Sequence, residues 1–418
     1  MKGKISNACK PDITPILVDG LASTATQGAA DDSASRLPQQ ALLDGLQERP
    51  QALKKSNSAD WSARTLPQWA PGPGTSSKAL LIQSPPHPTS SDEMFGLGEL
   101  PAPGKARWEY LTKTENWHPE RQELHSRLLS QARTASLRLA ESIESDGYPP
   151  TLFALRGNTA TGKTRIATKT IPVLANALKK SSGGGCINPD IFKRSLAESQ
   201  GEAMKLSSAQ VHAESCVLAD RLENELRSQR TTSGAMASIL VDKRLANTHE
   251  VDSYVSLAKE TGRKVELCDI DAPLERSLMG VLQRSPGGDD PRPPYVAVAN
   301  GFSTVRSNRL DVIDRFLSNP TLGSYRLFGT NEKGEKVMVA SVADGELSIH
   351  DPKLYESITA PEDFNSGDKG EQVIDTALID RLSNSIDDPK RATDARAALE
   401  KYKGMTWSNA LAAHSSLI

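Results

Sequence analysis

Residues 155–164 read LRGNTATGKT, and this stretch decides the fold. From Gly157 onward it fits the pattern of a phosphate-binding loop, in which two glycines separated by four residues precede a lysine and a hydroxyl residue. Backbone N–H groups and the lysine of such a loop surround the phosphates of a nucleotide. The predicted nucleotide-binding residues are Gly157, Asn158, Thr159, Ala160, Thr161, Gly162, Lys163 and Thr164.

The sequence on both sides of the loop has the composition that phosphate binding requires. Residues 151–157 are a short apolar run after Pro149 and Pro150, which predicts a buried strand. Residues 163–180 predict a helix that Pro172 kinks or divides. A strand, a glycine loop and a helix in this order direct free N–H groups and the positive end of the helix dipole at bound phosphates.

Composition excludes several other classes of protein. Hydrophobic residues are 37% and aromatic residues 5% of the 418 residues, so part of the chain is expected to lack a packed core. The net charge of −2 gives no overall bias toward nucleic acid or anionic membrane, and no apolar run approaches the ~18 residues of a transmembrane helix. The N-terminal residues lack the apolar core of a signal peptide. Neither a disulfide framework nor a zinc site is expected, because C-x-x-C spacing is absent among Cys9, Cys186, Cys216 and Cys268.

Three regions differ in their patterning. Residues 1–103 are rich in Ser, Pro, Gly, Gln and Ala and are expected to be a disordered leader. Residues 104–320 begin with an amphipathic helix at 119–145 and then alternate strands with helices, which favours a parallel sheet covered on both faces. Residues 321–418 are expected to begin as a β-meander and to end as helices. The other predicted strands are 183–190, 237–242 and 264–271, and the other predicted helices are 208–229 and 250–262.

Two aspartates follow predicted strands, where a parallel sheet collects its functional side chains. Asp190 comes after the second strand and could accept the proton of an attacking hydroxyl, or it could cap the next helix. Asp242 ends the third strand and could hold Mg²⁺, or it could be a surface strand end. The residues alone leave both choices open.

Two arginines, Arg276 and Arg284, lie on a predicted helix that precedes a loop rich in proline and glycine. This is the arrangement of a lid whose arginines stabilise charge on a transferred phosphoryl group. The alternative is a solvated helix face, which is the ordinary environment of an arginine on a helix.

The motifs GNTATGKT, INPDIFK, HAE, ILVD and GRKVELCDIDAPLERSLMGVLQR occur in this order within residues 152–305. The series resembles zeta-toxin kinases, which are ATP-dependent small-molecule kinases of the α/β class, related in fold to polynucleotide kinases, that typically phosphorylate the 3′-hydroxyl of UDP-N-acetylglucosamine. The leader and the GNTATGKT and NPDIFKRS core resemble one branch, the zeta-toxin-like type III avirulence effectors of Xanthomonas. That branch phosphorylates NAD on the 3′-hydroxyl of the adenosine ribose and is paired with a small antitoxin-like protein.

The resemblance implies a role for each candidate residue. Lys163 is expected to contact the β and γ phosphates of ATP, and Thr164 to ligate Mg²⁺. Asp190 is expected to be the base that faces the acceptor hydroxyl. Arg284, with Arg276, is expected to stabilise the transfer. The implied fold is a P-loop kinase with a parallel sheet flanked by helices, plus a small C-terminal β-meander and helices.

One departure from the family pattern concerns the residues after Asp242, where many zeta toxins have Gly-Thr and this chain has Lys243 and Arg244. The departure leaves open whether Asp242 ligates the metal. The chain has no G-x-G-x-x-G, so nothing in it marks a Rossmann site for NAD. The NAD that the resemblance implies is therefore expected as an acceptor in the kinase groove. The alternatives are UDP-N-acetylglucosamine or a polynucleotide end as acceptor, or a nucleotide-gated interaction module without catalysis.

The resemblance also implies cofactors, partners and a site of action. ATP and Mg²⁺ are the expected cofactors, and a small antitoxin-like or chaperone protein is the expected partner, with neither nucleic acid nor membrane. Residues 1–103 are then expected to include a secretion signal for delivery by a type III system into a host cell. Residues 104–320 become the kinase domain, and residues 321–418 become its C-terminal extension.

Overall fold

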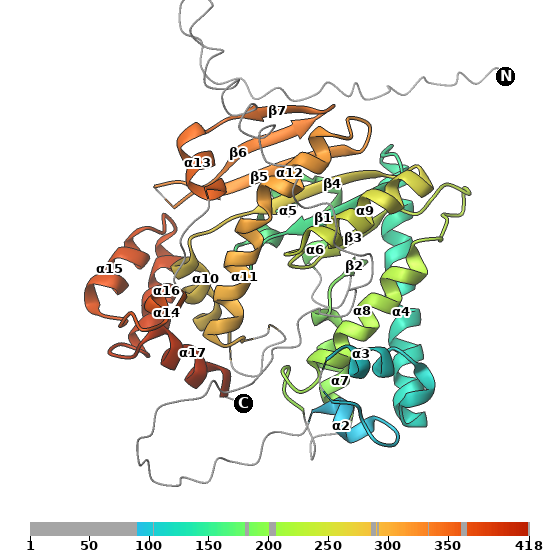
Figure 1. Ribbon diagram of the computed structural model, residues 1–418, viewed down its shortest axis with the longest axis horizontal. Helices are drawn as coiled ribbons and strands as arrows, with labels where there is room; N and C mark the ends of the chain where they lie inside the picture. Colours follow the sequence, from blue (N-terminus) through green and yellow to red (C-terminus); the bar gives the residue numbers. More distant parts are fainter. Residues whose placement is uncertain are drawn as a thin grey trace, which may run out of the picture. The chain divides into compact units, whose positions relative to one another are not determined.

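The computed structural model describes residues 90–102, 104–179, 184–199, 206–285, 290, 292–332, 334–360 and 366–416. All of them belong to one compact unit that contains the sheet and the helices of Figure 1. The leader predicted for residues 1–103 lies outside the described residues as far as residue 89.

Seven strands form one sheet in the order β2-β3-β1-β4-β5-β6-β7. The first five of these in that order run parallel, and β6 and β7 are antiparallel to their neighbours. All six residues of β1 are buried, as expected for a central strand that helices cover on both faces. The predicted α/β fold class is therefore confirmed. The strands are β1 Thr151–Arg156, β2 Cys186–Ile187, β3 Ile239–Asp242, β4 Lys264–Ile270, β5 Gly323–Thr330, β6 Lys336–Ala343 and β7 Glu346–Ile349.

The strands expected as a C-terminal β-meander form, and their first member joins the parallel sheet. β5 pairs with β4 in parallel from Gly323 to Phe328, and then with β6 in antiparallel orientation. Asp344 and Gly345 make the turn between β6 and β7 with φ values of 52° and 79°, the positive angles that a tight hairpin turn requires. A single sheet therefore crosses the boundary that we expected between residues 320 and 321.

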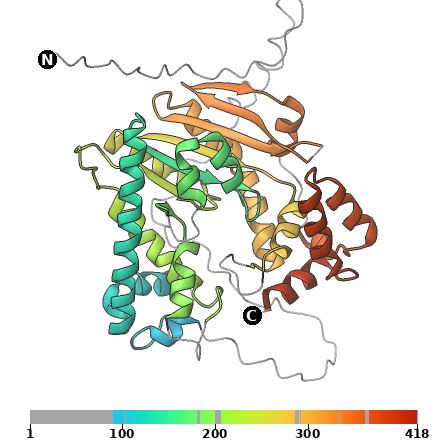
Figure 2. The ribbon, with the colours of Figure 1, turned by 180° about the vertical axis from the view of Figure 1, so that it is seen from behind.

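Helices cover both faces of the sheet. Apolar side chains of α4, α5 and α6 pack with Phe153 and Leu155 of β1 on one face, whereas α9 and α12 contact β4, β5 and β6 on the other (Figures 1 and 2). Pro172 divides the helix after the loop into α5, a 3₁₀ turn at Pro172–Leu174 and α6, as predicted. The helices of this part are α4 Pro119–Ser145, α5 Lys163–Thr170, α6 Ala175–Lys179, α7 Asp190–Glu198, α8 His212–Leu226, α9 Thr248–Thr261, α10 Leu274–Leu282, α11 Tyr295–Ser307 and α12 Arg309–Leu317.

Residues 90–102, which we expected inside the leader, fold against the helices that follow. Ser91 and Asp92 of α2 (Ser91–Phe95) are buried, and the Asp92 carboxylate accepts a hydrogen bond of 2.8 Å from Arg107 in α3 (Lys105–Leu111). The Ser91 N–H donates to the Gln210 carbonyl at 2.9 Å. The expected boundary was therefore wrong for this segment, because its average composition hides a buried carboxylate, Asp92, whose partner Arg107 lies outside the segment.

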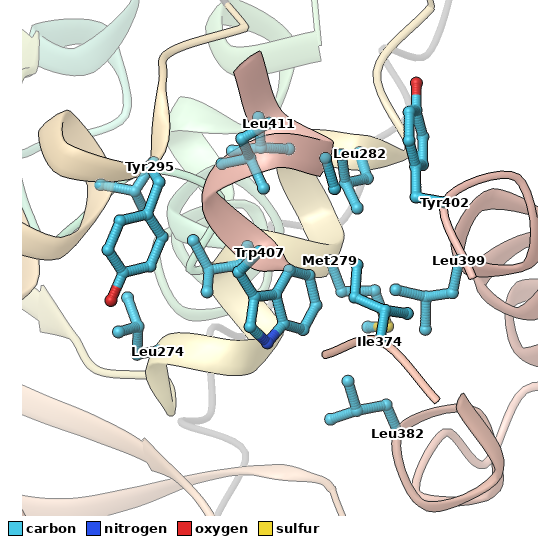
Figure 3. Packing of buried hydrophobic residues seen from close by; sticks show 14 of the residues in the cluster. Leu274, Met279, Leu282, Tyr295, Ile374, Leu382, Leu399, Tyr402, Trp407 and Leu411 are labelled. Atoms are coloured by element: carbon cyan, nitrogen blue, oxygen red, sulfur yellow. The ribbon is translucent and has the colours of Figure 1, made fainter. Parts of the chain in front are cut away.

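The C-terminal helices build a second hydrophobic core around α10 and α11. Figure 3 shows Trp407 of α17 lying among Leu274, Met279 and Ile374. No helix of the described residues combines the length and the apolar character needed to cross a membrane. The C-terminal helices are α13 Pro352–Thr359, α14 Ser366–Gly370, α15 Thr376–Asn384, α16 Pro389–Glu400 and α17 Trp407–Ser416.

Candidate functional site

The predicted phosphate-binding loop connects the end of β1 to the first turn of α5. Gly157 has a φ of 142°, and a Cβ there would overlap the Ile270 carbonyl at the end of β4, so this position requires glycine. Gly162 caps α5 in the left-handed conformation with a φ of 87°. The first N–H groups of α5 lack partners within the helix, which gives the loop an anion-binding helix terminus.

A buried network of charged side chains fixes the end of β1, where the loop begins. Arg156, the last residue of β1, forms an ion pair with Asp269 of β4, and its other nitrogens donate to the Leu245 carbonyl at 2.9 Å and the Val305 carbonyl at 2.7 Å. The Tyr325 hydroxyl of β5 donates to Asp269 at 2.9 Å. These bonds join β1, β4 and β5 to one another and to the segment after β3. They do so at the residue that immediately precedes Gly157.

Lys163 lies folded over the loop. Its Nζ donates to the carbonyls of Gly157 at 3.2 Å and Asn158 at 3.3 Å, and it lies 3.7 Å from a carboxylate oxygen of Asp242. Burial lowers the pKa of Lys163, and nearby Arg244 lowers it further, whereas Asp242 opposes the change. The loop lysine therefore lies in a partly buried cluster of charged side chains.

Asp242 belongs to this cluster rather than to the surface. Its side chain is only 12% exposed, and burial raises the pKa of the carboxyl group. The negative charge of Asp190 raises that pKa further, and Lys163 opposes both effects. Asp242 is therefore not a surface strand end, and the binding of Mg²⁺ by its carboxylate stays a prediction.

Asp190 is the first residue of α7 and does not cap it. Pro189 occupies the cap position, and the Asp190 N–H donates to the Asn188 side chain at 2.9 Å. The Asp190 carboxylate is instead 2.7 Å from Nζ of Lys193, one turn further along the helix. The capping alternative is therefore wrong, and the carboxylate remains 31% exposed and interacts electrostatically with Lys163.

The two candidate arginines have different surroundings. Burial lowers the pKa of Arg284, while the nearby carboxylates of Asp290 and Asp190 oppose the change, so this arginine lies within the cluster. Arg276 donates to the carbonyl and the hydroxyl of Ser385 at 2.5 and 2.7 Å. The structure therefore does not bring Arg276 to the loop as expected, because the end of α15 engages its guanidinium group.

Sequence reasoning missed Arg244 as a site residue. Its guanidinium donates to the Thr159 hydroxyl at 3.3 Å, and its carbonyl accepts the Gly157 N–H at 3.2 Å. A Cβ at Gly301 of α11 would lie 2.8 Å from the guanidinium carbon, so this glycine leaves the space that Arg244 fills. Lys243 faces the other way and pairs with Glu223 at 2.6 Å. The presence of Lys243 and Arg244 where many zeta toxins have Gly-Thr was a signal in the sequence. It did not indicate which of the two side chains faces the loop.

Comparison with known proteins identifies the family of the chain. The zeta toxin family profile matches residues 136–300, and no curated protein matches the chain. Solved structures of AvrRxo1-ORF1 with AvrRxo1-ORF2 are 66% identical to the chain, covering 79% of it and 99% of the matching chain. The TM-scores are 0.75 for the complex with sulphate ions and 0.76 for the complex with ATP.

The chain belongs to the zeta toxin family and is a zeta-toxin-like kinase. Within that family it is related to AvrRxo1-ORF1, a Xanthomonas avirulence effector. The predicted resemblance is therefore confirmed.

Proposed function

We propose that the chain transfers the γ-phosphoryl group of ATP to the 3′-hydroxyl of the adenosine ribose of NAD. The observation that carries the proposal is the single cluster of Lys163, Asp190, Asp242 and Arg284 at one edge of the sheet. A protein that only bound a nucleotide would need the loop but would not need a carboxylate in the position of Asp190. The related complex solved with ATP supports ATP as the phosphoryl donor.

Each residue of the cluster has a task in this transfer. The loop N–H groups and Lys163 bind the β and γ phosphates, and Arg284 stabilises charge on the phosphoryl group as its bond to the leaving oxygen breaks. Asp190 orients the acceptor hydroxyl and accepts its proton while the new O–P bond forms. Because phosphoryl transfer has a loose transition state, orientation contributes more than proton removal.

The residues present fit an Mg²⁺ ion. Among the described residues no group of three or more histidine, cysteine or acidic side chains could hold a metal on its own. Mg²⁺ usually binds one or two protein oxygens together with phosphates and water, and the Thr164 hydroxyl and the Asp242 carboxylate supply such oxygens. The bound ion would neutralise charge on the phosphates.

NAD as the acceptor rests on the relationship to the avirulence effector branch. The test incubates the protein with ATP, Mg²⁺ and one acceptor at a time, namely NAD, NADP or UDP-N-acetylglucosamine, and measures product masses. NAD should gain one phosphate, and an NADP-dependent dehydrogenase specific for the 2′-phosphate should reject the product. NADP should be the poorer acceptor, because its 2′-phosphate crowds the 3′-hydroxyl. Ordinary 2′-NADP as the product, or phosphorylation of UDP-N-acetylglucosamine alone, would contradict the 3′-hydroxyl of NAD as the acceptor. Either result would still agree with a kinase activity.

Two variants test the residue roles. Lys163→Ala should abolish ATP turnover in a folded protein, because the charge on the phosphates is lost. Asp190→Asn keeps the shape of the side chain and should slow transfer by up to ~10² to 10⁴ fold with ATP binding intact. A folded Lys163→Ala variant with normal turnover would contradict the assignment of the loop.

A protein partner and delivery into a host complete the proposal. The related AvrRxo1-ORF1 was crystallised with AvrRxo1-ORF2, and we propose that a similar small protein binds this chain and blocks the acceptor side of the groove. We also propose that the leader directs secretion by a type III system into the host cytoplasm. If the affinity for NAD were unchanged when the partner is bound, the partner would not block the acceptor side of the groove. Delivery without the leader would exclude its role as the signal.

A further inference from the structure

Lys193 is a buried cation directly behind the proposed base. It lies on α7 one turn after Asp190, and its side chain is 2% exposed whereas that of Asp190 is 31% exposed. The Lys193 Nζ is 2.7 Å from Oδ1 of Asp190. The ammonium group therefore approaches the carboxylate from the protein interior, and the carboxylate itself stays partly exposed.

Stability does not account for a lysine in this position. The neighbouring side chains on the buried face of α7, Phe192 and Leu196, are apolar. Burying an ammonium group costs several kcal/mol, and attraction to one carboxylate repays that cost only when the remaining protons are also hydrogen-bonded. The Lys193 Nζ has no further hydrogen-bond partner among the described residues. A methionine at position 193 would fill the same space without the cost of burying a charge.

The other charged side chains near Asp190 indicate what the lysine does. Lys163 and Arg284 both lie close enough to interact electrostatically with Asp190, and Asp242 lies close enough to repel it. Without an opposing cation, the Asp190 carboxylate would be drawn onto Lys163 or Arg284, which the proposed transfer requires for the phosphates. His212 at the start of α8 also interacts electrostatically with Asp190, but its side chain is exposed to solvent, which screens that interaction.

We infer that Lys193 is a positioning residue that holds Oδ1 of Asp190 and leaves Oδ2 directed at the acceptor hydroxyl. This inference rests on the proposed role of Asp190 in the transfer. Because the Lys193 side chain is only 2% exposed, its effect on the reaction would pass through the Asp190 carboxylate. A displacement of about 1 Å at a reacting group can cost ~10² fold in rate, which sets the scale of the expected effect.

The test compares Lys193→Met with Lys193→Arg, using ATP and whichever acceptor the product analysis identifies. Lys193→Met should lower kcat by about 10- to 100-fold while the KM for ATP stays within about twofold of the wild-type value. Lys193→Arg should recover part of the lost kcat, because its guanidinium also reaches the carboxylate. Arg194→Met is the matched control, since Arg194 lies on the same helix with a side chain that is 66% exposed and pairs with Glu198. It should leave kcat unchanged.

A double variant separates this inference from the proposed function. If Lys193 acts through Asp190, Lys193→Met should have no further effect on kcat when Asp190 is already asparagine. Equal losses from Lys193→Met in both backgrounds would overturn the inference, as would a normal kcat in Lys193→Met itself. A normal kcat in Asp190→Asn would instead overturn the role of Asp190 in the proposed function. If Lys193→Met does not fold, Lys193→Gln serves in the same comparison, because it keeps a polar end without the charge.

Discussion

Gly280 on α10 determines where the phosphate-binding loop can lie. A Cβ at this position would be 2.8 Å from the Cβ of Ala160, which is closer than real Cβ atoms approach one another. Ala160 lies in the middle of the loop with a φ of 59°, a left-handed conformation that an alanine rarely adopts. Gly280→Ala should therefore push the loop away from α10.

The energy of the change can be worked out from its parts. Alanine in place of glycine inside a helix stabilises it by about 1 kcal/mol, whereas overpacking costs about 1–3 kcal/mol. The loop already holds about 1–3 kcal/mol of backbone strain at Ala160, so it is expected to move before the packed helix does. If the loop takes up ~1–2 kcal/mol of the overpacking, the Kd for ATP rises roughly 5- to 30-fold. Thermal stability changes little, because the helix gain offsets part of the cost.

Calorimetric titration with ATP and thermal unfolding check both expectations. The matched control is the double variant Gly280→Ala with Ala160→Gly, which removes the opposing methyl group and places glycine at the positive φ. Its ATP affinity should return to within a few fold of the value for Ala160→Gly alone. Wild-type ATP affinity in Gly280→Ala, or no recovery in the double variant, would refute the argument that α10 sets the position of the loop.

Three further predictions concern stability. Burial raises the pKa of the Asp269 carboxyl, but Arg156 and its neighbours hold it below the usual range, so this contribution to stability is present above about pH 4 and is lost on acidification. In urea unfolding, Asp269→Asn should cost about 3–5 kcal/mol at pH 7, and less at pH 3; an equal loss at both pH values would contradict the pairing. Trp407→Ala should cost about 3–5 kcal/mol of unfolding free energy, and a loss below 1 kcal/mol would show that the second core is not cooperative with the sheet. A chain that starts at Ser90 should melt at a higher temperature than one that starts at Gly104, because only the first keeps the ion pair of α2 with α3; equal melting temperatures would restore the original boundary.

Local sequence determined the elements that form the sheet and the loop. The apolar run of β1 predicted a buried strand because a strand covered on both faces has no position for an exposed polar side chain. Gly157 and Gly162 marked the loop because their positive φ values are accessible to glycine at little cost. Gly262 ended α9 for the same reason, with a φ of 71°. These are properties of a few consecutive residues, so they could be predicted without knowledge of the rest of the chain.

Only the tertiary structure decided which charged side chains meet. Arg244 rather than Lys243 faces the loop because the side chains of successive residues diverge, and the acidic residues of α8 that pair with Lys243 come from about twenty positions earlier. Arg276 is engaged by Ser385, which lies more than a hundred positions further along the chain. An electrostatic or hydrogen-bonding partner is selected by distance in space, and the pattern of neighbouring residues carries no information about a segment that folding brings into contact.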